Sequence, residues 1–306
     1  MTLLDFNPTT AAALIGFLTP FIVVGVGVAK DRRVQKKIEK SPQREKLLRP
    51  PGYSLSQRLI DLGDRLYVVL SVAGFVSAFA AIFITTTVRV WAGGAGVGWI
   101  AAMALLSIAL LGLSINRILS TFTLIEDMRR CRLGLRGEQA VAESLNELAA
   151  SGYRAFHDLP GHEISSGDTR WNIDHVLVGP RGVFVIETKA RMRRPGKGTG
   201  AAHELSVDGE KLIYASGRDL KAIPQAKNKA HTLARFLTKE TGEPVSVDWL
   251  VVVPGYFVKA DKANYAHVMN ATSVAKFLQT LPVRIEPAQV RRIANAVDKK
   301  CRDVEF

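Results

Sequence analysis

The chain has 306 residues, of which 47% are apolar, and its 41 Lys and Arg outnumber 28 Asp and Glu to give a net charge of +13. This composition, with 25 Gly and 13 Pro, excludes a disordered or collagen-like chain. The two cysteines, Cys131 and Cys301, are too few for a disulfide framework or a four-cysteine zinc site. They favour a reducing compartment.

Three uncharged apolar segments are each close to the length of about 20 residues that a helix needs to cross a bilayer. They comprise residues 11–29, 66–87 and 97–115. Residues 1–130 are therefore predicted to form a membrane region with three spans; core helices of a soluble domain are the alternative. No Lys or Arg precedes residue 11, which indicates a retained anchor rather than a cleaved signal peptide.

Positive charge is distributed unevenly between the loops. Eleven Lys and Arg lie between residues 30 and 65, whereas the turn between the second and third apolar segments contains only Arg89. The positive-inside rule places the basic loop and the chain after Arg117 in the cytoplasm, with the N-terminus outside. We therefore expect a multi-pass protein of the cell (inner) membrane. Its basic loop would bind membrane lipids through anionic headgroups, and a stalk at 116–130 would lead into a cytoplasmic domain at 131–306.

Residues 131–306 alternate between helical and strand-like patterns, which predicts a mixed α/β domain. Helices are expected at 135–151, 224–241, 273–280 and 287–302. Strands are expected at 153–159, 171–178, 182–189 and 247–253, with a hairpin at 205–216. The run VDWLVVV at 247–253 predicts a buried central strand.

Residues 172–190, NIDHVLVGPRGVFVIETKA, predict a β-hairpin, because a Gly-Pro-Arg-Gly turn signal at 179–182 separates two β-rich runs. A symmetric turn would place Asp174 directly opposite Glu187, with their Cβ atoms about 5 Å apart. An odd-length loop would break this register. Lys189 follows Glu187 by two residues and would therefore share its face of the strand.

Two opposed carboxylates repel each other, and a divalent cation between them would remove that repulsion. Mg²⁺ is commonly held by one or two carboxylates together with water and substrate phosphates. A neighbouring lysine can stabilise negative charge that develops on the phosphate. Asp174, Glu187 and Lys189 thus form a candidate metal-dependent catalytic site, and an ordinary cross-strand ion pair is the alternative.

Two further polar residues are candidates by position. Glu138 falls on one helical stripe with Val141 and Leu145, which predicts that it faces inward. A glutamate stabilised by the helix dipole is the alternative. Gln225 lies at the start of a later helix, where a polar residue is often simply solvated.

At these residues the chain resembles the nuclease-related domain (NERD) proteins. The matching pieces are Gly137-Glu138, Ile173-Asp174-His175, the block 179–189 and Gln225, within a region of about 134–240. The family is similar to the PD-(D/E)xK nucleases, so the resemblance implies a restriction-endonuclease-like fold with a mixed sheet flanked by helices. One departure is Ile223-Pro224, where the family has Asn-Pro before the glutamine.

The resemblance also implies roles for the site residues. Asp174, Glu187 and Lys189 would form the catalytic core, supported by Glu138 and Gln225. Mg²⁺ or Mn²⁺ would be held by Asp174 and Glu187, with Glu138 as a possible third ligand.

Basic side chains adjoin these motifs and are predicted to bind nucleic-acid phosphates, with DNA favoured over RNA; a solvated surface is the alternative. They are Arg191, Arg193, Arg194, Lys197, Lys227 and Lys229. Few aromatic residues are interleaved with them, so base stacking is not expected. The resulting prediction is a membrane-anchored, metal-dependent nuclease. The alternative is a membrane-tethered module that binds nucleic acid or protein without cleaving it.

Overall fold

The computed structural model describes residue 30 and residues 46–94, 96–165, 171–193, 202–260 and 267–304. Contacts divide the chain into two units, which are described separately. One unit contains Leu59–Arg129, and the other combines Arg44–Arg58 with Arg130–Phe306. The expected boundary after residue 130 lies next to the observed one. Residues 44–58, however, belong to the second unit, although the sequence analysis assigned them to the membrane region.

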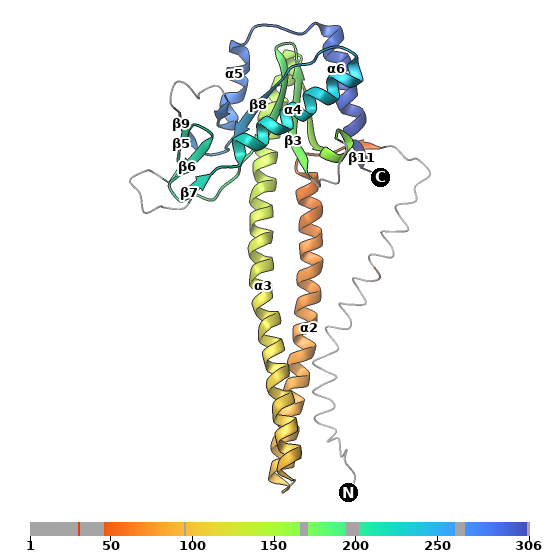
Figure 1. Ribbon diagram of the computed structural model, residues 1–306, viewed down its shortest axis with the longest axis vertical. Helices are drawn as coiled ribbons and strands as arrows, with labels where there is room; N and C mark the ends of the chain where they lie inside the picture. Colours follow the sequence, from red (N-terminus) through yellow and green to blue (C-terminus); the bar gives the residue numbers. More distant parts are fainter. Residues whose placement is uncertain are drawn as a thin grey trace. The chain divides into compact units, whose positions relative to one another are not determined.

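Two long helices, α2 (Tyr53–Ala92) and α3 (Val97–Asn146), contribute the helical unit (Figure 1). By length and composition, each could cross a membrane. They contain the expected second and third spans, whereas the expected span at 11–29 lies outside the described residues. The described chain therefore has two candidate spans where the sequence predicted three. Helix α3 also continues without a break through the expected stalk at 116–130.

Small side chains line the buried faces of α2 and α3. They recur every seven residues, and each is at most 6% exposed: Ala73, Ala80, Ser107, Ser114 and Thr121. A seven-residue repeat keeps one face of a helix against its partner. Small residues allow two helices to approach closely, and the Ser77 Oγ lies 2.5 Å from the Ser114 Oγ.

A five-stranded mixed sheet lies at the centre of the α/β unit, with strand order β10-β8-β4-β3-β2. Its strands are β2 (Arg154–Pro160), β3 (Asn172–Gly179), β4 (Gly182–Thr188), β8 (Val247–Val252) and β10 (Val268–Met269). Strands β2, β3 and β4 are antiparallel, whereas β8 pairs in parallel with β4 and β10. Strand β8 is an interior strand, as its apolar run predicted, but the central position belongs to β4.

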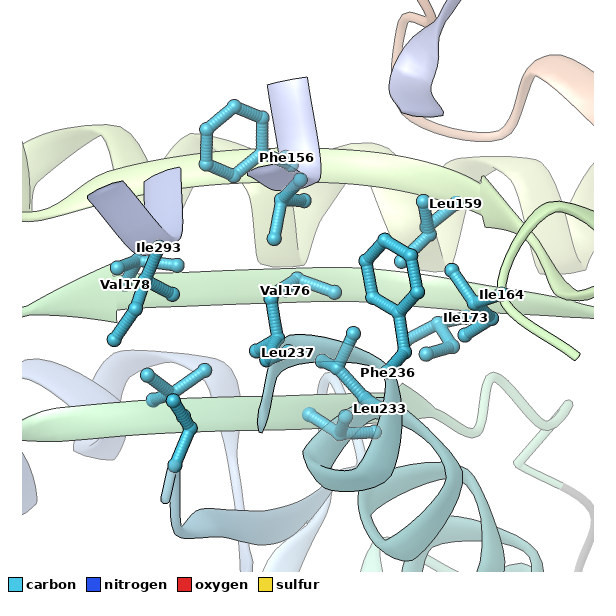
Figure 2. Close-up of a cluster of buried hydrophobic side chains, with 14 of the residues drawn as sticks. Phe156, Leu159, Ile164, Ile173, Val176, Val178, Leu233, Phe236, Leu237 and Ile293 are labelled. Carbon is cyan, nitrogen blue, oxygen red and sulfur yellow. The ribbon is translucent and has the colours of Figure 1, made fainter. Parts of the chain in front are cut away.

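Helices cover both faces of this sheet. Helices α4 (Ala222–Thr241) and α6 (Pro287–Cys301) pack on one face, where Leu233 and Ile293 meet Val176 (Figure 2). The C-terminal end of α3 and helix α5 (Val274–Thr280) contribute to the cluster that contains Leu177. Neighbouring residues of β3 thus enter different clusters, because successive side chains point to opposite faces of a strand. The result is the mixed sheet flanked by helices that the resemblance implied.

The remaining strands form two smaller sheets. The predicted hairpin is observed as β5 (Glu204–Asp208) and β6 (Lys211–Tyr214). These strands join β7 (Gly217–Asp219) and β9 (Phe257–Ala260) in the order β7-β6-β5-β9. Short 3₁₀ helices occur at Glu147–Ser151, Gly161–Glu163 and Ala271–Ser273. Strand β1 (Leu47–Leu48) pairs with β11 (Arg302–Val304), which ties the segment before α2 to the C-terminal end of the domain.

A buried carboxylate strengthens this tie. Asp158 is fully buried and accepts hydrogen bonds from the Arg49 Nη1 at 3.0 Å and the Ser54 Oγ at 2.6 Å. Asn172 also donates to it, and Arg49 forms a second ion pair with Asp303. Burial raises the pKa of Asp158, although Ser54 and Arg49 oppose the rise. A charge buried in this way depends strongly on its partners.

We expect Arg49→Met to lower the free energy of unfolding by about 3 kcal/mol, because it leaves Asp158 buried without its cation. Urea denaturation of the full chain in detergent micelles would measure this loss. The control is Arg302→Met, since Arg302 forms an exposed pair with Asp298 and should have little effect. Equal losses for the two variants would contradict the assignment. The predicted domain 131–306, if produced alone, would lack Arg49 and leave Asp158 without this partner. Experiments on the site therefore need the full chain.

Candidate active site

The hairpin of β3 and β4 brings Asp174 beside Glu187. The ladder follows the predicted symmetric register as far as the pair His175 and Ile186, directly before these two residues. The Thr188 N–H donates a hydrogen bond to Asp174 Oδ2 at 2.8 Å. Both acidic residues are nearly buried, with exposed fractions of 8% for Asp174 and 4% for Glu187. The sequence therefore predicted this juxtaposition correctly, because it depends only on the turn and the strand alternation.

Lys189 lies on the same face, also as expected. Its Nζ donates to Glu187 Oε1 at 2.8 Å and to Gln225 Oε1 at 3.0 Å. The Lys189 backbone N–H bonds to the Val252 carbonyl at 2.9 Å, which holds the residue beside β8. Gln225 is in the first turn of α4 and accepts this hydrogen bond from the ammonium group, so it is brought to the site as the resemblance implied.

The position of Lys229 differs from the expectation. It was predicted to bind nucleic-acid phosphates, but its side chain is only 14% exposed and points to the carboxylates. Its Nζ lies 3.3 Å from Asp174 Oδ1 and also donates to Glu187 Oε2. Lys229 therefore neutralises the repulsion for which the sequence analysis invoked a metal ion.

These contacts shift the pKa values of the cluster. Burial, followed by the negative charge of Glu187, raises the pKa of Asp174 to about 6, although Lys229 opposes the rise. Burial by itself lowers the pKa of Lys229, but the two carboxylates together raise it above its ordinary value. The ion pairs thus favour a charged Lys229 ammonium in a nearly closed site.

Glu138 faces inward from α3, as predicted, and is 7% exposed. Its Oε2 is buried and has no hydrogen-bond partner among the described residues. Burial, followed by the negative charge of Asp174, raises the pKa of Glu138 to about 9. Burial thus favours the protonated form of this carboxyl group.

A role for Glu138 as a third metal ligand stays a prediction. In the part of the chain that the structure describes, no three His, Cys, Asp or Glu side chains are grouped so that they could hold a metal ion. Asp174 and Glu187 share the Lys229 ammonium, whereas Glu138 Oε2 has no hydrogen-bond partner among the described residues. Sequence periodicity could orient Glu138 inward, but it could not show the desolvation that protonates it.

Arg191 and Arg193 lie shortly after strand β4 and Lys189 in the chain. The Arg191 guanidinium lies over the Tyr214 ring, 4.4 Å from its centroid, and 3.6 Å from Asp219 Oδ2. Arg193 is exposed. Arg194 and Lys197 lie outside the described residues. The structure therefore shows Arg193 on the surface and Arg191 engaged by an aromatic ring and an acid.

Lys227, the remaining predicted phosphate ligand, projects from α4. Its Nζ donates to Glu210 Oε1 at 2.5 Å and lies 5.4 Å from the centroid of the Trp249 ring. The side chain is 43% exposed. Lys227 is thus largely open to solvent, whereas Lys229, two residues later on the helix, is only 14% exposed.

A cavity of about 350 Å³ opens beside this cluster. It is lined by Ser165, Trp171, Gln225, Asn228, Lys229 and Thr232. Four of these residues were not predicted as site residues from the sequence: Ser165, Trp171, Asn228 and Thr232. Helical spacing relates the last two to Gln225 at three and seven residues, but no sequence signal connects Trp171 with α4.

The comparisons with known proteins agree with the resemblance in the sequence. Residues 133–254 match the family model described as the nuclease-related domain, NERD. The match extends from the end of α3 to β8 and includes Glu138, Asp174, Glu187, Lys189 and Gln225. No curated protein and no solved structure matches the chain. Residues 133–254 therefore correspond to a nuclease-related domain.

Proposed function

We propose that the chain is a membrane-anchored, metal-dependent nuclease that hydrolyses phosphodiester bonds. One observation carries the proposal: the ends of β3 and β4 bring Asp174, Glu187 and Lys189 together, and Gln225 holds the lysine ammonium. The family match and the mixed sheet flanked by helices support a place among the PD-(D/E)xK-like nucleases.

The carboxylate pair fits a divalent cation such as Mg²⁺ or Mn²⁺. Asp174 and Glu187 both contact the Lys229 ammonium, so their oxygens already converge on one cation position. Two carboxylates, completed by water and a substrate phosphate, are a common ligand set for Mg²⁺. A metal held by these two residues would polarise the phosphate and lower the pKa of a bound water.

Lys189 is the group positioned to act on the phosphate. Its ammonium is fixed by Glu187 and Gln225, and its side chain is 23% exposed, so it remains open to a substrate. A preorganised cation stabilises negative charge that develops on the phosphate oxygens, because little reorganisation is needed during the reaction. Gln225 is a positioning residue in this scheme.

The proposal is tested by incubating the full chain in lipid nanodiscs with single-stranded and double-stranded DNA and RNA. Cleavage is expected with Mg²⁺ or Mn²⁺ and not with EDTA. Lys189→Ala should reduce the rate by about 10²-fold, whereas Lys276→Ala, a matched change at an exposed lysine of α5, should retain activity.

The alternative is a module that binds nucleic acid or protein without cleaving it. The Lys229 ammonium favours this alternative, because it occupies the cation position between the carboxylates. Binding of nucleic acid without cleavage, for every substrate and metal in the assay, would support the module and reject the nuclease.

The membrane anchor is proposed from the helical unit and the order of the chain. Trp91 and Trp99 are 69% and 74% exposed near the α2–α3 turn, and aromatic residues commonly mark the membrane interface. The pairing of β1 with β11 places both ends of the α2–α3 hairpin in one domain. Both ends therefore lie on one side of the membrane, and the positive-inside rule makes that side the cytoplasm.

Cysteine labelling of intact cells tests this topology. A membrane-impermeant maleimide should react with Ala92→Cys, near the turn, without permeabilisation. Asp208→Cys, on the surface of the α/β unit, should react only after permeabilisation. An epitope at the N-terminus should be detected from outside if residues 11–29 form a third span. Labelling of position 208 in intact cells would reject the cytoplasmic placement.

A further inference from the structure

The cavity beside the carboxylate cluster has lining residues that the proposed chemistry does not use. Its volume of about 350 Å³ is within the range of small-ligand pockets, about 300–1,000 Å³. Gln225 and Lys229 belong both to its wall and to the cluster. A ligand in the cavity would therefore lie next to the site of the proposed reaction.

Trp171 supplies a rigid aromatic wall. Its ring packs directly on the backbone of Gly161, where an added Cβ would lie 2.3 Å from the indole. The Gly161 N–H also donates to the Trp171 carbonyl at 2.7 Å. The side chain packs against the core cluster below α4 and α6, yet it is only partly buried. An indole that is held in place by packing, yet is partly exposed and lines a cavity, is a suitable platform for a stacked nucleobase.

Helix α4 contributes polar groups to the lining of the cavity. Asn228 and Thr232 share one face of the helix with Gln225. The Thr232 hydroxyl donates to the backbone carbonyl of Asn228 at 2.9 Å. The side-chain amide of Asn228 is exposed and has no hydrogen bond within the described part of the chain. It therefore offers both a donor and an acceptor, which the edge of a base requires.

We infer that this cavity binds one unpaired nucleobase, stacked on Trp171 and hydrogen-bonded by Asn228, with the adjoining phosphate toward Lys229 and Lys189. The inference rests on the proposed function for the class of substrate. A base within a duplex is stacked on both faces and cannot enter such a cavity without being flipped out. The preferred substrate is consequently single-stranded nucleic acid or a duplex with an extruded nucleotide. This reverses the expectation from sequence that bases are not stacked.

Binding without metal tests the inference independently of cleavage. The full chain in nanodiscs, with EDTA, is titrated with a labelled six-nucleotide strand, its abasic sugar–phosphate analogue and the matching duplex. Wild type should bind the strand about 5- to 100-fold more tightly than the abasic analogue. Trp171→Leu and Asn228→Ala should reduce that preference without weakening binding of the abasic analogue. Trp171→Phe should preserve it, as should His231→Ala, an exposed change on the same helix.

Each outcome decides the inference. It is overturned if wild type binds the abasic analogue or the duplex as tightly as the strand, or if Asn228→Ala keeps the full preference. Should Trp171→Leu fail to fold, Asn228→Ala decides, because its side chain is on the surface. If the protein prefers the strand with bases through Asn228 but cleaves nothing, nucleobase binding is supported and the nuclease activity is rejected. If it cleaves nucleic acid but shows no such preference, the nuclease activity is supported and nucleobase binding is rejected.

Discussion

Glu187→Gln is expected to abolish cleavage and to lower the free energy of unfolding by about 3 kcal/mol. Glu187 accepts hydrogen bonds from Lys189 and Lys229, and the Lys229 side chain is only 14% exposed. Removing the carboxylate leaves a nearly buried ammonium with Asp174 as its remaining acidic partner. If the two carboxylates only repelled each other, Glu187→Gln would raise the free energy of unfolding. Lys229 reverses the sign of this expected change, because its ammonium pairs with both carboxylates.

A double-mutant cycle separates the two effects. Adding Lys229→Met to Glu187→Gln should restore most of the lost stability, because no cation is then left poorly paired. It should not restore cleavage. Lys227→Met is the matched control, since Lys227 is exposed and pairs with Glu210, and it should restore neither property. Thermal unfolding of full chains in nanodiscs, measured beside cleavage rates, gives both readouts. Wild-type stability in Glu187→Gln would show that the cluster does not depend on the ion pair.

Glu138→Gln is expected to stabilise the protein by about 5 kcal/mol at pH 8 and to have little effect at pH 4.5. The pKa of Glu138 rises from 4.5 to about 9 on folding, mainly through burial. Between these values the folded state retains a proton that the unfolded state has released. The unfolded state therefore binds fewer protons, and stability falls as the pH rises through this window. Glutamine is a neutral isostere that does not titrate.

Urea denaturation at pH 4.5, 6 and 8 measures the difference between wild type and Glu138→Gln. Glu143→Gln, an exposed change on the same helix, should show no such trend. The same samples address the metal. Since Glu138 lies outside the carboxylate pair, Mg²⁺ should stabilise Glu138→Gln as much as wild type. A pH-independent difference would contradict the assignment of a neutral buried acid, and loss of Mg²⁺ stabilisation would return Glu138 to the metal site.

The sequence by itself determined the features that depend on neighbouring residues. The symmetric turn and strand alternation set Asp174 beside Glu187 and Lys189. Helical periodicity turned Glu138 inward, and apolar length identified the segments 66–87 and 97–115 now found in α2 and α3. These signals are local because they arise from the geometry of one strand, one turn or one helix.

Only the tertiary structure decided the features that depend on how one element packs against another. The charge run on α4 does not reveal which lysine faces the sheet, so Lys229 was expected on the surface while it in fact neutralises the carboxylate pair. The ion pair of Arg49 with Asp158 joins residues 109 apart, and the cavity brings Trp171 against α4. The raised pKa of Glu138 follows mainly from burial, a property of the packed domain rather than of any segment. Orientation and desolvation are set by long-range packing, and sequence periodicity carries no record of either.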